Sequence, residues 1–273
     1  MTEIQEKANT IPQELSIAEI RKYTKEAAPL IHCITNPISI HDCANIILAA
    51  GARPIMAEHP AEVAEITAVA SALMLNLGNI TDARIESIQR ALKEANRRKI
   101  PVLLDLVGVT CSSLRREFAR KLLADGRFAV IKGNISEILA AADLPFHGTG
   151  IDAGSQDAIS QANEARYCTT AKKLAEHLGC TVMATGKLDL IADRHQAFLI
   201  ANGHTALSGI TGTGCMVGAL TAAYLPASVA LAFTGIPAAL LAAITMGIQE
   251  NMPHPAPKVL EAFRQLFWMK FSA

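Results

Sequence analysis

Two glycines and a thiol lie close together in the stretch LSGITGTGCMVGAL, residues 207–220. Gly212 and Gly214 permit backbone conformations and close approaches that a Cβ would block. The apolar residues after Cys215 predict a helix, and the free N–H groups at its start would favour an anion such as phosphate. The stretch has neither the lysine of a Walker loop nor a G-x-G-x-x-G pattern. A tight turn into a buried helix therefore stays open as a second interpretation of the glycines.

An amide and a carboxylate stand three residues apart in KGNISEI, residues 132–138. Asn134 and Glu137 would share one opening where a strand passes into a helix. Because Mg²⁺ keeps most of its waters and needs few carboxylates, this pair suits water-mediated binding of that ion. The alternative is structural, with Asn134 or Ser136 capping the helix.

Short apolar runs alternate with helical patterns along the chain. Runs that are apolar on both faces are typical of parallel strands covered by helices on each side. We expect strands at 30–35, 54–57, 73–78, 102–108, 128–134 and 181–186, and a hairpin at 188–203. We expect helices at 38–51, 60–70, 81–98 and 112–124, a short helix that begins near 136, and another helix that ends near 177. Since no repeat or linker interrupts this pattern, it predicts one α/β domain over residues 1–273.

Polar residues follow several of the predicted strands. Ligands of open α/β sheets collect at the carboxyl ends of the strands, where loops lead into helices. The residues at such ends are Asn36, Asn76, Asp105, Asn134 and Thr185. Each could instead cap the next helix, so only their combination indicates a binding site.

Composition excludes some partners. Lys+Arg and Asp+Glu both number 25, which gives a net charge of zero and argues against nucleic acid as a partner. The six cysteines include no C-x-x-C pair, so we expect neither a zinc site nor a disulfide framework, and a reduced cytoplasmic location. The beginning, MTEIQEKANTIPQEL, is polar and acidic, so we do not expect it to act as a signal peptide.

A long uncharged region lies between Arg194 and Glu250. Its later part, ASVALAFTGIPAALLAAITMGI at 227–248, is long enough to span a bilayer. It is rich in alanine, is broken by glycine and proline, and lacks flanking basic residues and an aromatic belt. We therefore expect two buried helices of a soluble core and no membrane span.

Several motifs together resemble the hydroxyethylthiazole kinase family of the ribokinase-like superfamily. They occur in the family's order and spacing from about Leu30 to Leu220: ITNPISIHDCANIILAAGARPIMAEHPAEV, LNLGNIT, LLDLVGV, KGNISEI, ATGKLDLIAD, NGH and TGTGC. The resemblance implies a three-layer α/β/α fold and a homotrimer with active sites between neighbouring subunits. It also implies phosphorylation of 4-methyl-5-(2-hydroxyethyl)thiazole by ATP, in thiamine salvage.

The same resemblance implies roles for residues on the acceptor side of the site. Met56 and Gly212 would contact the thiazole, and Asn36 would lie near it. Gly212 and Gly214 would frame the phosphoryl group as it is transferred. Cys215 stands where other superfamily members place an aspartate that serves as a base.

Residues on the nucleotide side are implied in the same way. Lys132 and Thr185 would contact ATP, while Asp105 and Glu137 would serve Mg²⁺ and the phosphates. Phosphoryl transfer depends mostly on positioning and charge neutralisation. We therefore expect Cys215, with a pKa lowered by the helix start, to orient the hydroxyl and to assist only modestly.

Some positions depart from the family pattern. Lysine stands at 132 where arginine is usual, Leu106 stands where proline is usual, and the tail NMPHPAPKVLEAF lacks the usual glycine-rich turn. Two alternatives follow. One is a ribokinase-like kinase of another heteroaromatic alcohol, such as a hydroxymethylpyrimidine or a pyridoxal compound. The other is a thiazole-binding protein with weak catalysis.

Overall fold

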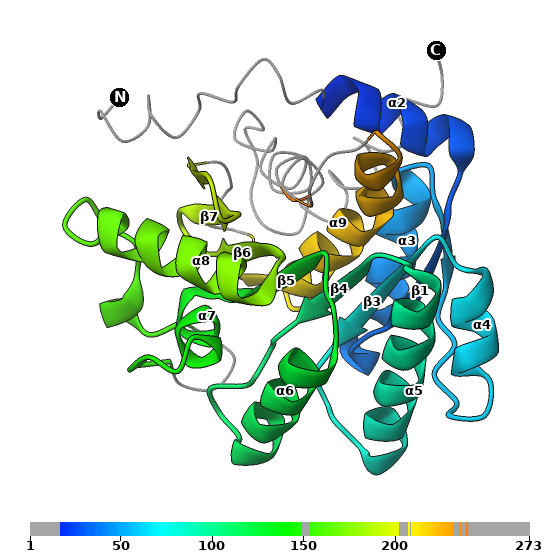
Figure 1. Ribbon diagram of the computed structural model, residues 1–273, viewed down its shortest axis with the longest axis horizontal. Helices are drawn as coiled ribbons and strands as arrows, with labels where there is room; N and C mark the ends of the chain where they lie inside the picture. Colours follow the sequence, from blue (N-terminus) through cyan, green and yellow to red (C-terminus); the bar gives the residue numbers. More distant parts are fainter. Residues whose placement is uncertain are drawn as a thin grey trace.

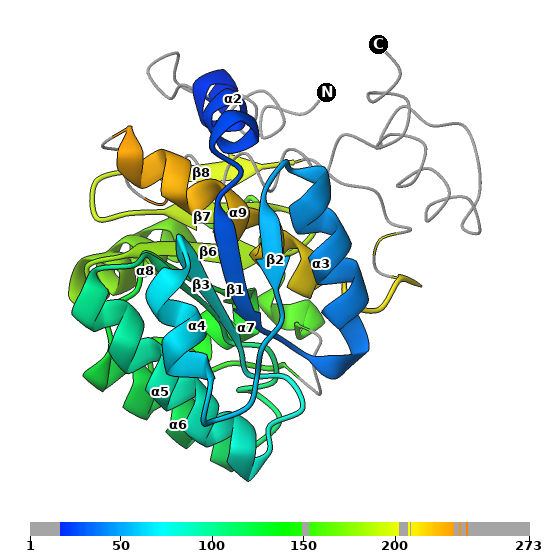
Figure 2. The same cartoon turned by 90° about the vertical axis from the view of Figure 1, so that its right-hand side faces the viewer.

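One eight-stranded sheet organises residues 17–148, 153–201, 207, 209–231, 235 and 239, which the computed structural model describes. Its order is β2-β1-β3-β4-β5-β6-β7-β8, with β1 and β3 to β7 labelled in Figure 1 and β2 and β8 in Figure 2. Neighbours from β2 to β6 are parallel, and β7 and β8 add antiparallel pairs, so the predicted mostly parallel sheet is confirmed. The strands are β1 Leu30–Ile34, β2 Arg53–Ile55, β3 Ala72–Asn76, β4 Val102–Asp105, β5 Val130–Asn134, β6 Thr181–Thr185, β7 Asp189–Ala192 and β8 Ala197–Ile200.

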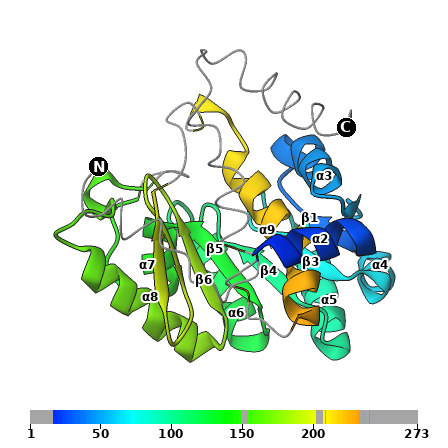
Figure 3. The ribbon, with the colours of Figure 1, turned by 90° about the horizontal axis from the view of Figure 1, so that it is seen from above.

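Helices cover both faces of the sheet and make three layers (Figures 2 and 3). One layer contains α4 Val63–Val69, α5 Asp82–Arg98, α6 Ser113–Asp125, α7 Ile135–Ala141 and α8 Glu164–Leu178. The other contains α2 Ile17–Ala27, α3 Ile40–Ala49 and α9 Thr213–Ala230. Short 3-10 helices occupy Pro37–Ser39 and Ser155–Asp157. The described residues thus have the α/β/α layering that the sequence predicts.

The central strands are buried on both faces, which explains their apolar sequences. All five residues of β3 are buried. Leu73 and Leu75 pack into the core under α4–α8, whereas Ala72 and Met74 pack into the core under α2, α3 and α9. Successive side chains of a strand point to opposite faces, so a doubly covered strand needs apolar residues throughout.

The predicted helix at 38–51 is interrupted at its start. A 3-10 turn covers Pro37–Ser39, and α3 begins only at Ile40. The Asn36 side chain accepts a hydrogen bond from the Ile38 N–H at 3.1 Å. Asn36 therefore caps this turn, as the structural interpretation of strand-end polar residues anticipates.

Helix α9 crosses the middle of the sheet and is a core helix. Among the described residues it is the one helix long and apolar enough to span a membrane, and 67% of that window is buried within the protein. A Cβ on Gly218 would lie 2.9 Å from Met74 Cε, so this glycine allows the close approach of helix and sheet. The apolar helix predicted after Cys215 is confirmed as α9. Of the segment 227–248, α9 contains only residues 227–230, and residues 232–234, 236–238 and 240–248 lie outside the described part.

Candidate active site

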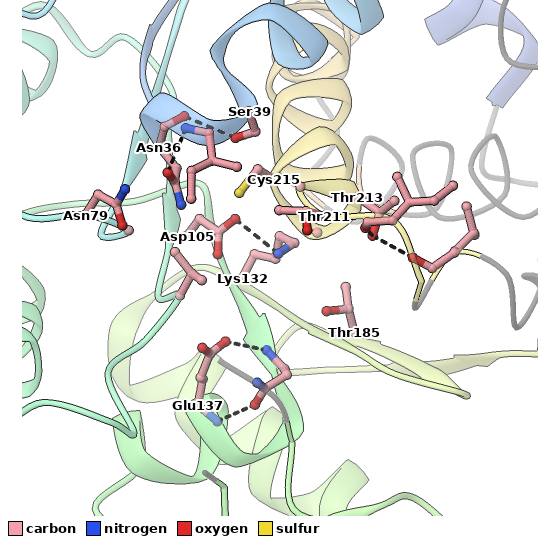
Figure 4. Close-up of a pocket in the computed structure, with 18 of the residues that line it drawn as sticks. Asn36, Ser39, Asn79, Asp105, Lys132, Glu137, Thr185, Thr211, Thr213 and Cys215 are labelled. Carbon is pink, nitrogen blue, oxygen red and sulfur yellow. Dashed lines mark hydrogen bonds and ion pairs between the residues drawn. The ribbon is translucent and has the colours of Figure 1, made fainter. Parts of the chain in front are cut away.

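A pocket of about 480 Å³ opens where the parallel strands end and α9 begins (Figure 4). The sheet brings together residues that are far apart in sequence, because the carboxyl ends of parallel strands share one edge. The predicted site residues that line this pocket are Asn36, Asp105, Lys132, Asn134, Glu137, Thr185, Gly212, Gly214 and Cys215. Met56 is not among its lining residues.

Glycine at 212 is required by the backbone. Its φ is +88°, and a Cβ there would also lie 2.9 Å from Ser39 Cβ. The residue is the N-cap of α9 and supplies no side-chain cap, so the first N–H groups of the helix face the pocket without one. The tight-turn interpretation of the glycines is thus confirmed. The uncapped helix start suits an anion, and phosphate binding there stays a prediction.

A buried ion pair lies next to this helix start. Lys132 Nζ is 3.1 Å from Asp105 Oδ2, and the two side chains are 4% and 1% exposed. A Cβ on Gly214 would lie 3.7 Å from Lys132 Nζ, which places the ammonium beside the loop. Burial raises the pKa of Asp105, and Lys132 partly offsets this. For Lys132 burial acts to lower the pKa, but Asp105, Cys215 and Glu137 together outweigh it and leave the pKa raised, so the lysine stays charged.

Glu137 holds two turns of backbone at the floor of the pocket. Its Oε1 accepts from the Gly108 N–H and its Oε2 from the Asn134 N–H, both at 2.7 Å. Asn134 Oδ1 in turn accepts from the Glu137 N–H at 2.9 Å, completing a capping box. Burial, reinforced by Asp105, raises the pKa of Glu137 to about 7. The capping interpretation of this motif is thus confirmed.

The donor set also fits a magnesium ion. Asp105 Oδ1 is buried without a hydrogen-bond partner of normal geometry among the described residues. Asp105 and Glu137 place two carboxylates in one pocket, and the negative charge of Asp105 helps to raise the pKa of Glu137. A cation would relieve this repulsion. No group of three or more His, Cys, Asp or Glu side chains suited to a metal occurs in the described residues, but Mg²⁺ in kinase sites uses one or two carboxylates with substrate phosphates.

Cys215 lines the pocket as a buried, protonated thiol. Asn76 Nδ2 donates a hydrogen bond to its sulfur at 3.3 Å. Burial raises the pKa of Cys215, and the charge of Asp105 raises it further. The expected lowering of this pKa by the helix start is therefore wrong, because desolvation and a neighbouring carboxylate outweigh it. All six cysteines lie in the described residues as free thiols, as the sequence predicts.

Met56 lies just after β2, partly buried against the core under α3 and α9. The next residue is held in place by His32, whose Nε2 lies 2.9 Å from the Ala57 carbonyl oxygen. Since a carbonyl oxygen only accepts, Nε2 carries the proton, and Nδ1 accepts from Thr67 Oγ1 at 2.8 Å. Met56 thus has a defined position after β2 and is not among the residues that line the pocket.

Sequence reasoning missed five polar residues of the pocket: Ser39, Asn79, Arg115, Thr211 and Thr213. Arg115 lies in the first turn of α6, the helix that follows Asp105 and its strand. That position carried a usable signal, since the first turn of a helix after a parallel strand faces the same edge as the strand end. The NGH motif, residues 202–204, lies outside the described residues.

The model of the hydroxyethylthiazole kinase family matches residues 21–253. The chain belongs to this family. It is 47% identical over 230 residues to hydroxyethylthiazole kinase 2 of Clostridium botulinum, covering 84% of this chain and 85% of the relative. It is 45% identical over 201 residues to hydroxyethylthiazole kinase of Clostridium acetobutylicum, covering 74% of each.

Solved structures agree with this assignment. The hydroxyethylthiazole kinase protein of Pyrococcus horikoshii has a TM-score of 0.78 and 30% identity, and 92% of each chain is covered. A ribokinase-like superfamily protein of Enterococcus faecalis has a TM-score of 0.59 at 11% identity, which shows the fold alone. The predicted family and its ribokinase-like fold are therefore confirmed.

Proposed function

We propose that this protein transfers the γ-phosphoryl group of ATP to the hydroxyl of 4-methyl-5-(2-hydroxyethyl)thiazole, a step of thiamine salvage. The main observation behind this proposal is that one pocket contains the start of α9, the Lys132–Asp105 ion pair and the Glu137 carboxylate. An anion site, a cation and two carboxylates are the parts that phosphoryl transfer needs, because it depends on positioning and charge neutralisation. Family membership supports the choice of the thiazole alcohol as acceptor.

In the proposed reaction the hydroxyl oxygen bonds to the γ-phosphorus as the bond to the ADP oxygen breaks, ADP keeps the electron pair of that bond, and the hydroxyl proton is released to solvent. The N–H groups at the start of α9 receive the moving phosphoryl group, with Gly212 and Gly214 leaving room for it. Lys132 places its positive charge beside that loop. Thr185 lines the nucleotide side of the pocket, anchored by its own hydrogen bond to the Gly133 carbonyl at 3.3 Å.

Asp105 and Glu137 would hold Mg²⁺ in this proposal. Asp105 Oδ1, which has no hydrogen-bond partner of normal geometry among the described residues, would be the direct ligand. Glu137 already accepts two backbone hydrogen bonds, so a water-mediated contact suits it better. When bound, the ion would neutralise charge on the phosphates of ATP.

Cys215→Ser is expected to keep kcat within about tenfold of the parent, because a protonated thiol is a poor base and general-base catalysis would contribute about 10²–10⁴-fold. Serine keeps a hydroxyl that can accept from Asn76 and orient the substrate. Steady-state kinetics at saturating ATP and thiazole would measure this. A loss beyond about 100-fold, with ATP binding intact, would instead assign Cys215 the role of base.

The position of Met56 supports a homotrimer with active sites between subunits. Met56 is outside the pocket of its own chain, so a thiazole contact from it would come from a neighbouring subunit. Two variants, Met56→Ala and Glu137→Ala, are then expected to be weakly active alone and to regain activity when their subunits are mixed by reversible unfolding. Mixed assemblies of the two that regain nothing would contradict this arrangement.

Substrate comparison tests the proposed function. The ratio kcat/KM would be measured with Mg-ATP for the hydroxyethylthiazole, a hydroxymethylpyrimidine and pyridoxal. We expect the thiazole to be preferred. A preference for either other alcohol would replace the proposed acceptor, and tight thiazole binding without turnover would indicate a binding protein. A cytoplasmic location stays a prediction that the free thiols support.

A further inference from the structure

We propose that Arg115 is a second phosphate-binding residue of this site and contacts the β- or γ-phosphate of the bound nucleotide. This inference rests on the proposed use of ATP and names a residue whose role the family resemblance does not supply. Three observations carry it: the charge balance of the pocket, the place of the guanidinium beside Gly108, and the chemistry of arginine toward phosphate.

The charge balance leaves Arg115 as the available cation. Among the described residues, the charged side chains lining the pocket are Asp105, Arg115, Lys132 and Glu137, which sum to zero. Lys132 is committed to Asp105 at 3.1 Å. Arg115 forms no ion pair with any carboxylate in the described part of the chain, and its Nη1 makes only a long contact of 3.9 Å with Cys111 Sγ. Among the described residues of the pocket, Arg115 is therefore the positive charge that is free to pair with the phosphates of a bound nucleotide.

The guanidinium lies directly against Gly108. A Cβ on Gly108 would lie 3.1 Å from Arg115 Cζ, so the side chain occupies the space that only glycine leaves free. Gly108 also has a φ of +82°. Its N–H donates to Glu137 Oε1 at 2.7 Å. Arg115 and Glu137 thus pack on the same backbone turn, which places a cation next to the carboxylate proposed to serve the metal.

Arginine is suited to this position in a way that Lys132 is not. Its planar guanidinium stays charged and offers two parallel N–H donors to a phosphate. Lys132 is a point charge whose first partner is a buried carboxylate. The two cations therefore have different roles: Lys132 lies beside the glycine loop, and Arg115 contacts the phosphate chain.

Binding measurements with three nucleotides test this role. Isothermal titration calorimetry would give Kd for ATP, ADP and AMP with Arg115→Gln, Arg115→Lys and the parent protein. A charge-assisted, bidentate contact predicts that Arg115→Gln weakens ATP about tenfold or more and leaves AMP unchanged. Arg115→Lys should recover part of the loss. The Kd of the thiazole alcohol should stay the same in all three proteins.

Arg120→Gln is the matched control. Arg120 lies on the same helix and pairs with Asp143 outside the pocket. Its substitution removes the same charge from α6 but no side chain that lines the pocket. Its ATP affinity should equal that of the parent. Thermal unfolding of each variant would establish that the helix is intact.

Three results would overturn the inference. Arg115→Gln binding ATP as tightly as Arg120→Gln would show that the guanidinium contacts no phosphate, and equal weakening of ATP and AMP would show that the β- and γ-phosphates are not its target. Absence of ATP binding by the parent protein would remove this inference together with the proposed function. Binding by the parent with no change in Arg115→Gln would remove the inference alone.

Discussion

Asp105→Asn is expected to lower the free energy of unfolding by about 3–5 kcal/mol, because it leaves a buried ammonium without its opposing charge. Lys132 Nζ has Asp105 Oδ2 as its ion-pair partner at 3.1 Å, and its side chain is only 4% exposed. The same change removes the carboxylate oxygen that the proposal assigns to the metal. Mutation of a residue that only supports a metal ligand costs about 10–100-fold in activity, so loss of a direct ligand should lower kcat by at least about 100-fold.

The double variant Asp105→Asn/Lys132→Met separates the two effects. Methionine removes the unpaired charge and keeps an unbranched side chain, so most of the lost stability should return. Activity should not return, since neither the carboxylate nor the cation is restored. Urea unfolding and steady-state kinetics on the same preparations would measure both. A double variant as active as the parent would show that the pair is structural and does not serve the reaction.

Glu137→Gln is expected to lower kcat by about 100-fold while the protein stays folded. Glutamine at this position still supports the capping box with Asn134. It loses the charge proposed to serve Mg²⁺, and its amide cannot accept from both the Gly108 and the Asn134 N–H groups. Coupled detection of ADP release would measure the loss. Glu117→Gln, on the exposed face of α6, is the matched control and should be unaffected.

The raised pKa of Glu137 also predicts how the stability of the parent, compared with Glu137→Gln, changes with pH. Burial raises the pKa of Glu137 to about 7, above its value in the unfolded chain, so the folded state holds the proton more tightly. Without Mg²⁺, the parent should therefore lose stability relative to Glu137→Gln as the pH rises from about 4.5 to about 7. Urea unfolding at pH 5 and pH 8 would measure this difference. Parallel curves for the two proteins would contradict a buried, proton-binding Glu137.

Much of the fold follows from the sequence because the central strands are covered on both faces. The apolar run at 73–78 becomes β3, and the residues after the strands reach one pocket because parallel strands end at one edge. What the sequence did not reveal is pairing between strands. Asp105 and Lys132 are 27 residues apart, and only the parallel register of β4 with β5 sets them side by side.

Two features depend on tertiary surroundings that no local pattern encodes. The pKa of Cys215 is raised by burial and by Asp105, which comes from strand β4, so its position at a helix start gave the wrong direction. Met56 was assigned to the site by resemblance, but the single chain does not bring it there. Its role stays a prediction that depends on a neighbouring subunit.

The most direct test of the proposed activity is the fate of the phosphoryl group. Purified protein would be incubated with Mg-ATP and 4-methyl-5-(2-hydroxyethyl)thiazole, and mass spectrometry would quantify the phosphate ester and ADP. We expect the two products in equal amounts from the parent protein and a loss of both in Glu137→Gln. ADP without the ester, or ester formation that is unchanged in Glu137→Gln, would contradict the proposal that this pocket carries out the transfer.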